Sequence, residues 1–459
     1  MESQSTESSF VILHPEPATP VDARSRPGLQ AATWCRQVLS GSCRSITRCL
    51  STAATMARSL SALSDTICGR FGSVNETRWW VLSGFAAMVS AIAWSGHSFT
   101  IPVSLAFLLL LNCAWSRKGA FALAVGYYAG ATWQIVPGAG AFFRHHTNPL
   151  EILILWASVS LLLAGPWALL WSTTANSRLY RTPLTLLLLA IPPLGLIGCA
   201  SPLTSAGFLF PGLGWVGLAL AILVCALLTS YPAVALVLII STSVPAQFLY
   251  RAHAAPTDWQ TVNTRFGGVG LDMPSPLAEY RAAQSIQETA LASPARILAF
   301  PETVVPNWNP GTDLFWQRTI EALRKQGRTI LVGANVFDAG SQHYHDSVIV
   351  RGADEHPNFS QRIPVPLAMW LPFSNKGAPL QLGGPGTAEI GGKKVAILIC
   401  YEHLLVWPVV ASFVNRPDLL LGTANDYWAR RTSIPQIQHA CLESWARLFG
   451  VPLLWAQNT

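Results

Sequence analysis

The sequence predicts a polytopic α-helical membrane domain of about seven spans, followed by an α/β domain. Half of the residues are apolar and only 12% are charged, whereas soluble domains carry roughly 25% charge. Residues 119–250 contain only Arg144, Glu151, Arg178 and Arg181 as charged residues. After about residue 255, short apolar runs alternate with helical patterns. These observations predict a segment over 1–75, a membrane domain over 76–250 and an α/β domain over 251–459.

The segment 1–75 is basic and rich in Ser, Thr and Ala, and we expect it to be cytoplasmic and partly disordered. Between Arg24 and Arg70 it carries seven Arg and one acid, Asp65. Residues 35–71 are compatible with a basic amphipathic helix on the membrane surface or with a solvated tail. The whole chain has a formal charge of +7, which could indicate nucleic acid binding. The clustered Arg residues of this segment are instead typical of a juxtamembrane cytoplasmic segment, so we expect no direct nucleic acid binding.

Apolar runs long enough to approach a membrane span begin at Trp79. A bilayer core of about 30 Å requires roughly 20 helical residues. The predicted spans are residues 79–94, 99–116, 119–136, 150–171, 183–200, 213–229 and 232–250.

The basic residues in the loops predict the orientation, because cytoplasmic loops are enriched in Lys and Arg. The N-terminal segment, "SRK" at 116–118 and "NSRLYR" at 176–181 carry these residues. Seven spans with a cytoplasmic N-terminus place all three inside and everything after Arg251 outside. The prediction is a multi-pass protein of a bacterial inner membrane with its α/β domain on the periplasmic side.

The second half is predicted to alternate strands and helices, as in a layered α/β domain. The predicted strands are residues 260–267, 296–302, 328–337, 346–352, 394–400, 418–425 and 452–457. The predicted helices are residues 276–292, 313–326, 403–414 and 434–449.

Cys400 ends the apolar strand "KVAILIC" and precedes a predicted helix. Reactive groups in α/β sheets gather where strands end, and a helix N-terminus favours a thiolate. Glu302 follows the apolar strand "RILAFPE", where an acid can serve as the general base for a thiol. Each residue also has an ordinary interpretation, Cys400 as a small buried hydrophobe and Glu302 as a loop carboxylate.

Taken together, the strand ending in Pro301-Glu302 and the strand ending in Cys400, Tyr401 and Glu402 resemble the nitrilase (carbon–nitrogen hydrolase) superfamily. "TANDYW" (423–428) is similar to the segment that follows the nucleophile in that superfamily. The resemblance implies an α-β-β-α sandwich, with Glu302 as base, Cys400 as nucleophile and Glu402 as a second acid. It also implies that Tyr401, Asn425, Asp426 and Trp428 contribute to substrate binding.

A membrane half joined to such a domain resembles the apolipoprotein N-acyltransferase branch of the superfamily. Within the branch, "RIPVPLAMWLPF" (362–373) is most similar to the nitrilase-like TraB proteins of plasmid conjugal transfer. The branch implies a membrane lipid as acyl donor, a phospholipid or lipoprotein substrate, and conjugation-machinery proteins as partners. It implies neither a cofactor nor a metal.

The sequence departs from the acyltransferase pattern near Val365-Pro366. Gln361 stands where the resemblance expects the Lys of the triad, with Arg362 beside it, and Met369 stands where it expects an acid. Arg362 can supply charge to a developing oxyanion, but it is planar and does not deprotonate, so it is no equivalent of Lys. Lys376 is a second candidate cation.

Two functions follow from this pattern. In the first, the chain is a Cys-dependent amidase or acyltransferase in which Glu302 deprotonates Cys400 and a thioester acyl-enzyme forms. In the second, it is an assembly or regulatory factor for conjugation that keeps the fold without the reaction. A transporter is disfavoured because the predicted spans hold almost no ionisable residues.

Overall fold

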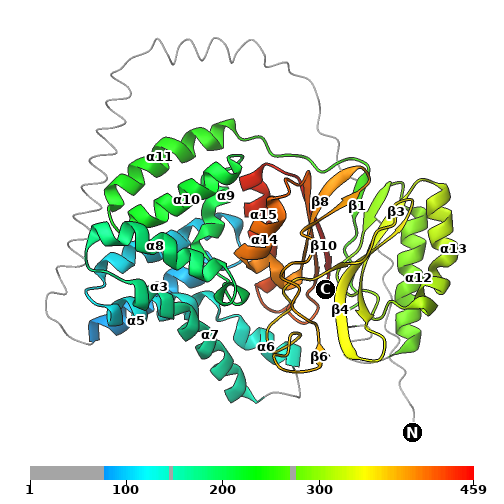
Figure 1. Ribbon diagram of the computed structural model, residues 1–459, viewed down its shortest axis with the longest axis horizontal. Coiled ribbons are helices and arrows are strands. Elements are labelled where there is room, and N and C mark those ends of the chain that lie inside the picture. Colours follow the sequence, from blue (N-terminus) through cyan, green and yellow to red (C-terminus); the bar gives the residue numbers. More distant parts are fainter. Residues whose placement is uncertain (1–76, 144–147, 269–274) are drawn as a thin grey trace, which may run out of the picture. The chain divides into compact units, whose positions relative to one another are not determined.

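The computed structural model describes residues 77–143, 148–268 and 275–459, all of which belong to one compact unit. A helical half, with blue to green ribbons in Figure 1, precedes a half with two sheets. The segment predicted over 1–75 lies outside the described residues.

The helical half consists of long helices joined by short turns. The long helices are α3 (Thr77–Ala93), α5 (Arg117–Ala131), α7 (Pro149–Leu170), α8 (Ala175–Ala190), α10 (Gly214–Leu228) and α11 (Pro232–Leu249). The shorter elements are η1 (Ser98–Leu105), α4 (Ala106–Leu110), η2 (Leu111–Cys113), α6 (Ile135–Phe143), η4 (Leu194–Leu196), η5 (Pro202–Ser205) and α9 (Ala206–Leu209).

Each of the seven predicted spans contains helix, but the number of membrane crossings is not confirmed. Among the described residues, two helices, α7 and α11, are long and apolar enough to cross a membrane. The run 98–113 is divided between 3₁₀ and α-helix, with Pro102 inside η1. Helix α8 begins eight residues before the predicted span over 183–200 and ends at Ala190, and α6 was not predicted.

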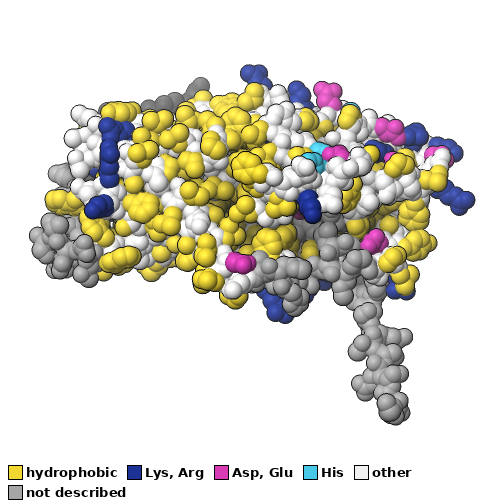
Figure 2. All heavy atoms as spheres, turned by 60° about the horizontal axis from the view of Figure 1, so that its bottom comes forward, with side chains coloured by type: hydrophobic (Ala, Val, Ile, Leu, Met, Phe, Trp, Pro, Cys, Tyr) yellow, Lys and Arg dark blue, Asp and Glu magenta, His cyan; other side chains and the backbone are white. Residues whose placement is uncertain are grey.

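The outward-facing surface of the helical half is apolar. Figure 2 shows hydrophobic side chains spread over this half, whereas charged side chains are denser over the other. On α11, Phe248 is 81% exposed and Leu249 is 80% exposed. Large contiguous apolar surfaces indicate contact with lipid or with another protein.

The second half is a four-layer α-β-β-α sandwich. One sheet has the order β1-β2-β3-β4-β5, with β6 paired to β4, and the other has the order β10-β9-β8-β7. The first contains β1 (Trp259–Thr261), β2 (Ile297–Ala299), β3 (Thr329–Phe337), β4 (Gln342–Gly352), β5 (Phe359–Ser360) and β6 (Lys376–Gly377). The second contains β7 (Thr387–Ile390), β8 (Lys393–Ile399), β9 (Leu419–Asn425) and β10 (Leu453–Asn458).

Alternating side chains of the buried strands pack into different layers, as the two-residue period of a strand requires. On β8, Val395, Ile397 and Ile399 belong to the core between the sheets. Ala396 and Leu398 belong to the core on the opposite face of the second sheet. Helices α12 (Pro276–Ala292) and α13 (Pro310–Lys325) cover the first sheet, and α14 (Val406–Phe413) and α15 (Ile434–Phe449) cover the second. The sandwich predicted through the resemblance is therefore present.

Helix α15 also joins the two halves. The Gly207 N–H of α9 donates to Ser444 Oγ at 3.2 Å, and Ser444 Oγ donates to the Thr204 carbonyl. A Cβ at Gly207 would lie 1.7 Å from the Ser444 carbonyl oxygen, so glycine is required for this approach. These contacts fix the short elements η5 and α9 of the helical half against α15.

Candidate active site

Cys400 lies directly after β8, where the chain turns through η6 (Cys400–Leu404) toward α14. It is 7% exposed. Its φ of +49° is in the left-handed region, which is costly for a residue with a Cβ. Such strain persists only where surrounding structure imposes it, and it is frequent at functional sites.

Glu302 lies just beyond β2 and is 5% exposed. The Asn425 N–H donates to Glu302 Oε2 at 2.6 Å, which fixes the carboxyl against the end of β9. The next residue, Thr303, also has a positive φ, of +48°. Gly333 on β3 permits the close passage of this segment, because a Cβ there would lie 2.2 Å from the Pro301 carbonyl oxygen.

The Cys400 thiol and the Glu302 carboxyl lie close enough to shift each other's pKa. Burial raises the pKa of Cys400 well above its usual value, and the negative charges of Glu302 and Asp426 raise it further. The pKa of Glu302 is also raised, mainly by burial and by the charge of Asp346, although the nearby thiol acts in the opposite direction. Both shifts favour the protonated form of the group concerned.

Asp346 is a third buried acid in the site, and the sequence analysis missed it. It lies on β4, is 1% exposed and lies close enough to Glu302 for each acid to shift the pKa of the other. Burial raises its pKa to about 6. The sequence offers one sign of this acid, its position directly before the run "SVIV". Its closeness to Glu302 is seen only in the folded structure.

Gln361 stands at the expected Lys position and is 3% exposed. Its neutral amide cannot supply the positive charge that a Lys would bring there. Its Nε2 donates to the Ile399 carbonyl at 3.1 Å, and its backbone N–H donates to the Asp346 carbonyl at 2.8 Å. Lys376 is exposed, and its strand β6 pairs with β4 at Gln342. The charged groups that shift the pKa of Glu302 are all acidic.

Arg362 and Glu402 form a buried ion pair, with Nε 3.3 Å from Oε1. Their side chains are 3% and 0% exposed. The guanidinium also donates to the Pro408 carbonyl at 3.1 Å. The Glu402 carboxylate accepts backbone N–H bonds from Arg362 at 2.9 Å and Ile363 at 3.3 Å through Oε1, and from Ile399 at 3.1 Å through Oε2. The pair thus connects the segment after β5 to the turn that carries Cys400.

Asn425 and Asp426 end β9 beside the site. Asn425 Oδ1 accepts from Asn458 Nδ2 at 2.7 Å, and Asp426 Oδ2 accepts from Gln457 Nε2 at 2.8 Å. Burial raises the pKa of Asp426 to about 7. The amide of Gln438, oriented to satisfy its neighbours, donates to Asp426 Oδ1 at 3.0 Å and Oδ2 at 3.2 Å.

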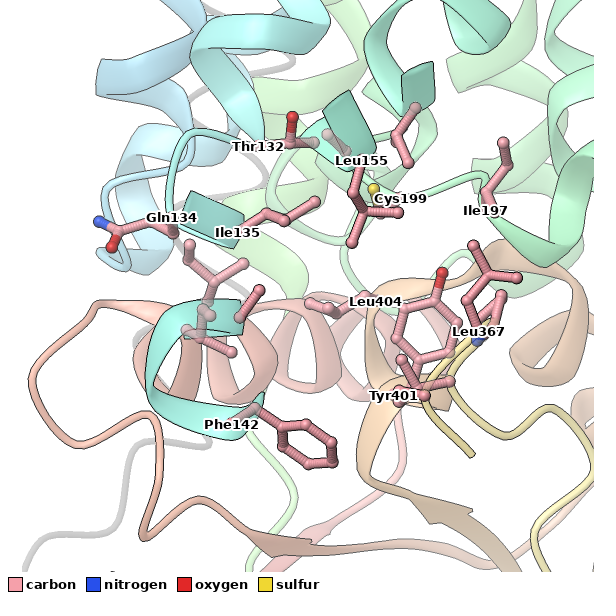
Figure 3. Close-up of a pocket in the computed structure, with 18 of the residues that line it drawn as sticks. Thr132, Gln134, Ile135, Phe142, Leu155, Ile197, Cys199, Leu367, Tyr401 and Leu404 are labelled. Carbon is pink, nitrogen blue, oxygen red and sulfur yellow. The ribbon is translucent and has the colours of Figure 1, made fainter. Parts of the chain in front are cut away.

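Cys400 lines a cavity of about 320 Å³ that lies between the two halves of the molecule. Tyr401 and Trp428 line it from the α/β half. Figure 3 shows Tyr401 and Leu367 facing the same space as Leu155 of the helical half. The Tyr401 hydroxyl donates to the Leu196 carbonyl at 2.9 Å, and Trp428 contacts Phe142 edge-to-face, with centroids 5.3 Å apart.

The lining of this cavity is almost entirely apolar. The helical half contributes mainly Trp94, Ala131, Ile135, Ala139, Phe142, Phe143, Leu155, Val159, Leu162, Ile197 and Ala200. Apolar walls with a few polar groups are typical of small-molecule sites. The arrangement can hold an alkyl chain and place a carbonyl group near the Cys400 sulfur.

His403 does not serve as a base for Cys400. Its Nε2 lies 2.9 Å from the Leu398 carbonyl, and its ring contacts Trp455 with centroids 5.2 Å apart. Burial lowers its pKa to about 3, so the ring stays neutral. Within the described residues, no group of three His, Cys, Asp or Glu side chains is arranged to hold a metal ion.

Solved structures similar to this chain include an amidase from Nesterenkonia sp., at 16% identity and a TM-score of 0.32, over 44% of this chain and 74% of the other. Another is a glutamine-dependent NAD+ synthetase from Acinetobacter baumannii, at 17% identity and a TM-score of 0.25, over 36% and 31% of the two chains. The sandwich assignment rests on the strand pairing and core packing described above.

Sequence relatives extend over most of the chain, although no protein-family model matches it. A conjugal transfer protein TraB from Agrobacterium fabrum is 30% identical over 433 residues, which are 88% of this chain and 99% of that protein. A probable conjugal transfer protein TraB from Sinorhizobium fredii is 31% identical over 385 residues, or 81% and 96% of the two chains. The chain therefore belongs to the conjugal transfer protein TraB family.

Proposed function

We propose that the chain is a membrane-embedded, nitrilase-like protein of plasmid conjugal transfer that forms a thioester acyl-enzyme on Cys400. The observation that carries the proposal is the position of the Cys400 thiol, which lies beside the Glu302 carboxyl and lines an apolar cavity. The exposed apolar surfaces of α7 and α11 support insertion into a bilayer. A membrane phospholipid is then the acyl donor that the cavity fits best.

The reaction begins with transfer of the Cys400 proton to ionised Glu302 as the sulfur attacks the ester carbonyl of the donor. The tetrahedral intermediate collapses, the carbon–oxygen bond breaks, and the leaving alkoxide takes the proton from Glu302. An amine or water then attacks the thioester and gives its proton to Glu302; the carbon–sulfur bond breaks, and the departing Cys400 thiolate takes that proton from Glu302, which restores the starting state. Backbone N–H groups of the turn at Cys400 would stabilise the oxyanion in both steps.

The remaining predicted residues receive supporting roles in this proposal. Arg362 and Glu402 are positioning residues, because their ion pair is directed at Pro408 and at the backbone around Ile399. Tyr401 and Trp428 form the cavity wall next to the sulfur. Asn425 and Asp426 hold Glu302 and Gln438 at the end of β9.

Bilayer orientation follows from the basic ends of the helices. Arg117 lies at the start of α5 and Arg178 in the first turn of α8. Residues that follow the other ends of these helices contact the α/β half. For example, Gln134 Nε2 donates to Ser433 Oγ at 2.6 Å. By the positive-inside rule, this arrangement supports a periplasmic position for the α/β half, where lipoprotein and conjugation-machinery partners would be accessible.

The test is labelling of membranes that contain the protein with a phospholipid bearing an alkyne-tagged acyl chain. We expect hydroxylamine-sensitive label on the wild-type protein and its absence in Cys400→Ala. Cys441→Ala is the matched control, because Cys441 is a free, buried thiol on α15 outside the cavity lining, and it should label like wild type. Undiminished label in Cys400→Ala contradicts the proposal.

A second function, an assembly or regulatory factor without catalysis, is favoured by one specific observation. Gln361 occupies the expected Lys position, and the charged neighbours that shift the pKa of Glu302 are all acidic. Plasmid transfer by cells that carry Cys400→Ala separates the two functions. Loss of transfer supports the enzyme, whereas full transfer together with unlabelled wild-type protein supports the assembly factor.

A further inference from the structure

The acids Glu302 and Asp346 form a carboxyl pair buried behind the nucleophile. Glu302 comes from the end of β2 and Asp346 from β4, and the two buried side chains lie close enough to shift each other's pKa. Two neighbouring buried carboxylates repel each other, which favours the state in which the pair keeps one proton.

The partners of Asp346 support a shared proton. Its Oδ1 accepts a bond from Thr303 Oγ1 at 3.3 Å. No N–H or O–H group of the described residues reaches its Oδ2, although the side chain is 1% exposed. A buried carboxylate oxygen without a donor is costly, and a proton on the Glu302 carboxyl supplies the missing donor.

Among the described residues, the groups that shift the pKa of the pair include no cation. The titratable groups that interact electrostatically with one or both acids are Tyr344 of β4, Cys400 and Glu402 of η6, and Asp426 directly after β9. All are acidic or neutral. The guanidinium of Arg362 is bonded to Glu402, which leaves a proton as the simplest means to neutralise the pair.

We infer that Asp346 is a positioning residue that shares one proton with Glu302 and so sets the pH above which Cys400 becomes reactive. While Glu302 holds that proton, it cannot accept the one from the Cys400 thiol. Loss of the shared proton to solvent frees Glu302. The Sγ–H bond then breaks, its proton moves to Glu302, and its electron pair stays on sulfur for attack.

This inference deepens the proposed function and rests on Cys400 and Glu302 being its reactive pair, but it requires no turnover. The experiment measures alkylation of Cys400 in the purified full-length protein by N-ethylmaleimide as a function of pH, with the Cys400 peptide quantified by mass spectrometry. Absence of acyl transfer contradicts only the proposed function. An unmoved alkylation profile contradicts only the role of Asp346.

The central variant is Asp346→Asn, whose amide can donate to an ionised Glu302. We expect the rise in Cys400 alkylation to occur at least one pH unit lower than in the wild type, so that alkylation at pH 7 is about ten-fold faster. Asp338→Asn is the control, because Asp338 is 46% exposed and pairs with His345; its profile should match wild type.

A double variant shows whether Asp346 acts through Glu302. In a Glu302→Gln background, Asp346→Asn should move the profile by less than half of the shift seen alone. An equal shift in that background, or a single-variant profile that superimposes on wild type, overturns the inference. Should Asp346→Asn fail to fold, infrared titration of the wild type decides: a protonated-carboxyl band that persists at neutral pH and weakens in Glu302→Gln supports the inference, and its absence contradicts it.

Discussion

The Cys400 thiol and the Glu302 carboxyl meet in one buried site, although they come from different sheets of the sandwich. Glu302 follows β2 in the first sheet, and Cys400 follows β8 in the second. Both strand ends lead into residues with positive φ, Thr303 and Cys400. The site is thus assembled where the two sheets face each other, and its geometry depends on how closely they pack.

Gly333 determines how closely the segment that carries Glu302 passes β3 within the first sheet. In Gly333→Ala the new Cβ would lie 2.5 Å from the Glu302 Cα, so the segment must move away from β3. We expect at least a ten-fold loss of Cys400 labelling by the acyl-phospholipid probe, because positioning errors of about 1 Å can cost 10²-fold. Gly383→Ala is the control, since its Cβ would meet nothing within 4 Å. Equal labelling of both variants would refute this account.

The buried ion pair between Arg362 and Glu402 should behave as a structural unit. Removal of one partner leaves an uncompensated buried charge, which costs about 3–5 kcal/mol. We expect thermal unfolding in detergent to show large losses for Arg362→Met and for Glu402→Gln. The double variant should lose clearly less than the sum of the two. Strictly additive losses would show that the two side chains do not stabilise each other.

The apolar cavity should determine which acyl chains are accepted. Leu155 lines it from α7, so Leu155→Trp should fill part of the space. We expect at least a ten-fold reduction in labelling by a palmitoyl probe and little change with an acetyl probe. Leu169→Trp, on the same helix at a 67% exposed position outside the lining, should leave both unchanged. Equal loss with both probes in Leu155→Trp would argue against a chain-binding cavity.

The raised pKa of Asp426 predicts that the stability of the protein depends on pH. Its pKa is raised from 3.8 to about 7 by burial, so the folded state favours its protonated form. The resulting stabilisation is fully present below the unfolded pKa and is lost as pH rises through about 7. We expect the unfolding free energy to fall between pH 4 and pH 7 by at most about 1.4 kcal/mol per pH unit from this group.

Thermal unfolding of the wild type and Asp426→Asn across this range measures the effect. The variant keeps the shape of the side chain but cannot ionise, so its stability should fall less steeply with pH. Asp338→Asn again serves as the exposed control. Parallel curves for wild type and Asp426→Asn would show that this carboxyl does not titrate as stated.

The sequence predicted the alternating strands and helices of the α/β half well because the long elements carry clear periodicity, whereas the sandwich arrangement was implied by the resemblance. Helices α12 and α15 coincide with the predicted ranges 276–292 and 434–449. The strands β5, β6 and β7, of two to four residues, were not predicted, because such short runs carry no alternation to read. Helix α13 begins at Pro310, three residues before its predicted start, because Asn309 caps it through a bond from the Thr312 N–H at 3.0 Å.

The site was predicted in part, for equally physical reasons. A strand end marks residues such as Glu302 and Cys400, and both lie in one site. Asp346 was missed because its approach to Glu302 depends on the strand order, in which β3 separates β4 from β2, and the sequence does not specify that order. The bonding of Arg362 to Glu402 and the Pro408 carbonyl depends on side-chain direction, which spacing along the chain does not fix.

The most direct test is peptide-level mass spectrometry of Cys400 in protein purified from donor-cell membranes without thiol reductant. We predict a fatty-acyl mass on the Cys400 peptide that hydroxylamine removes and that Glu302→Gln strongly reduces. A Cys400 peptide that stays unmodified in wild-type protein, under conditions in which plasmid transfer proceeds, would contradict the acyl-enzyme.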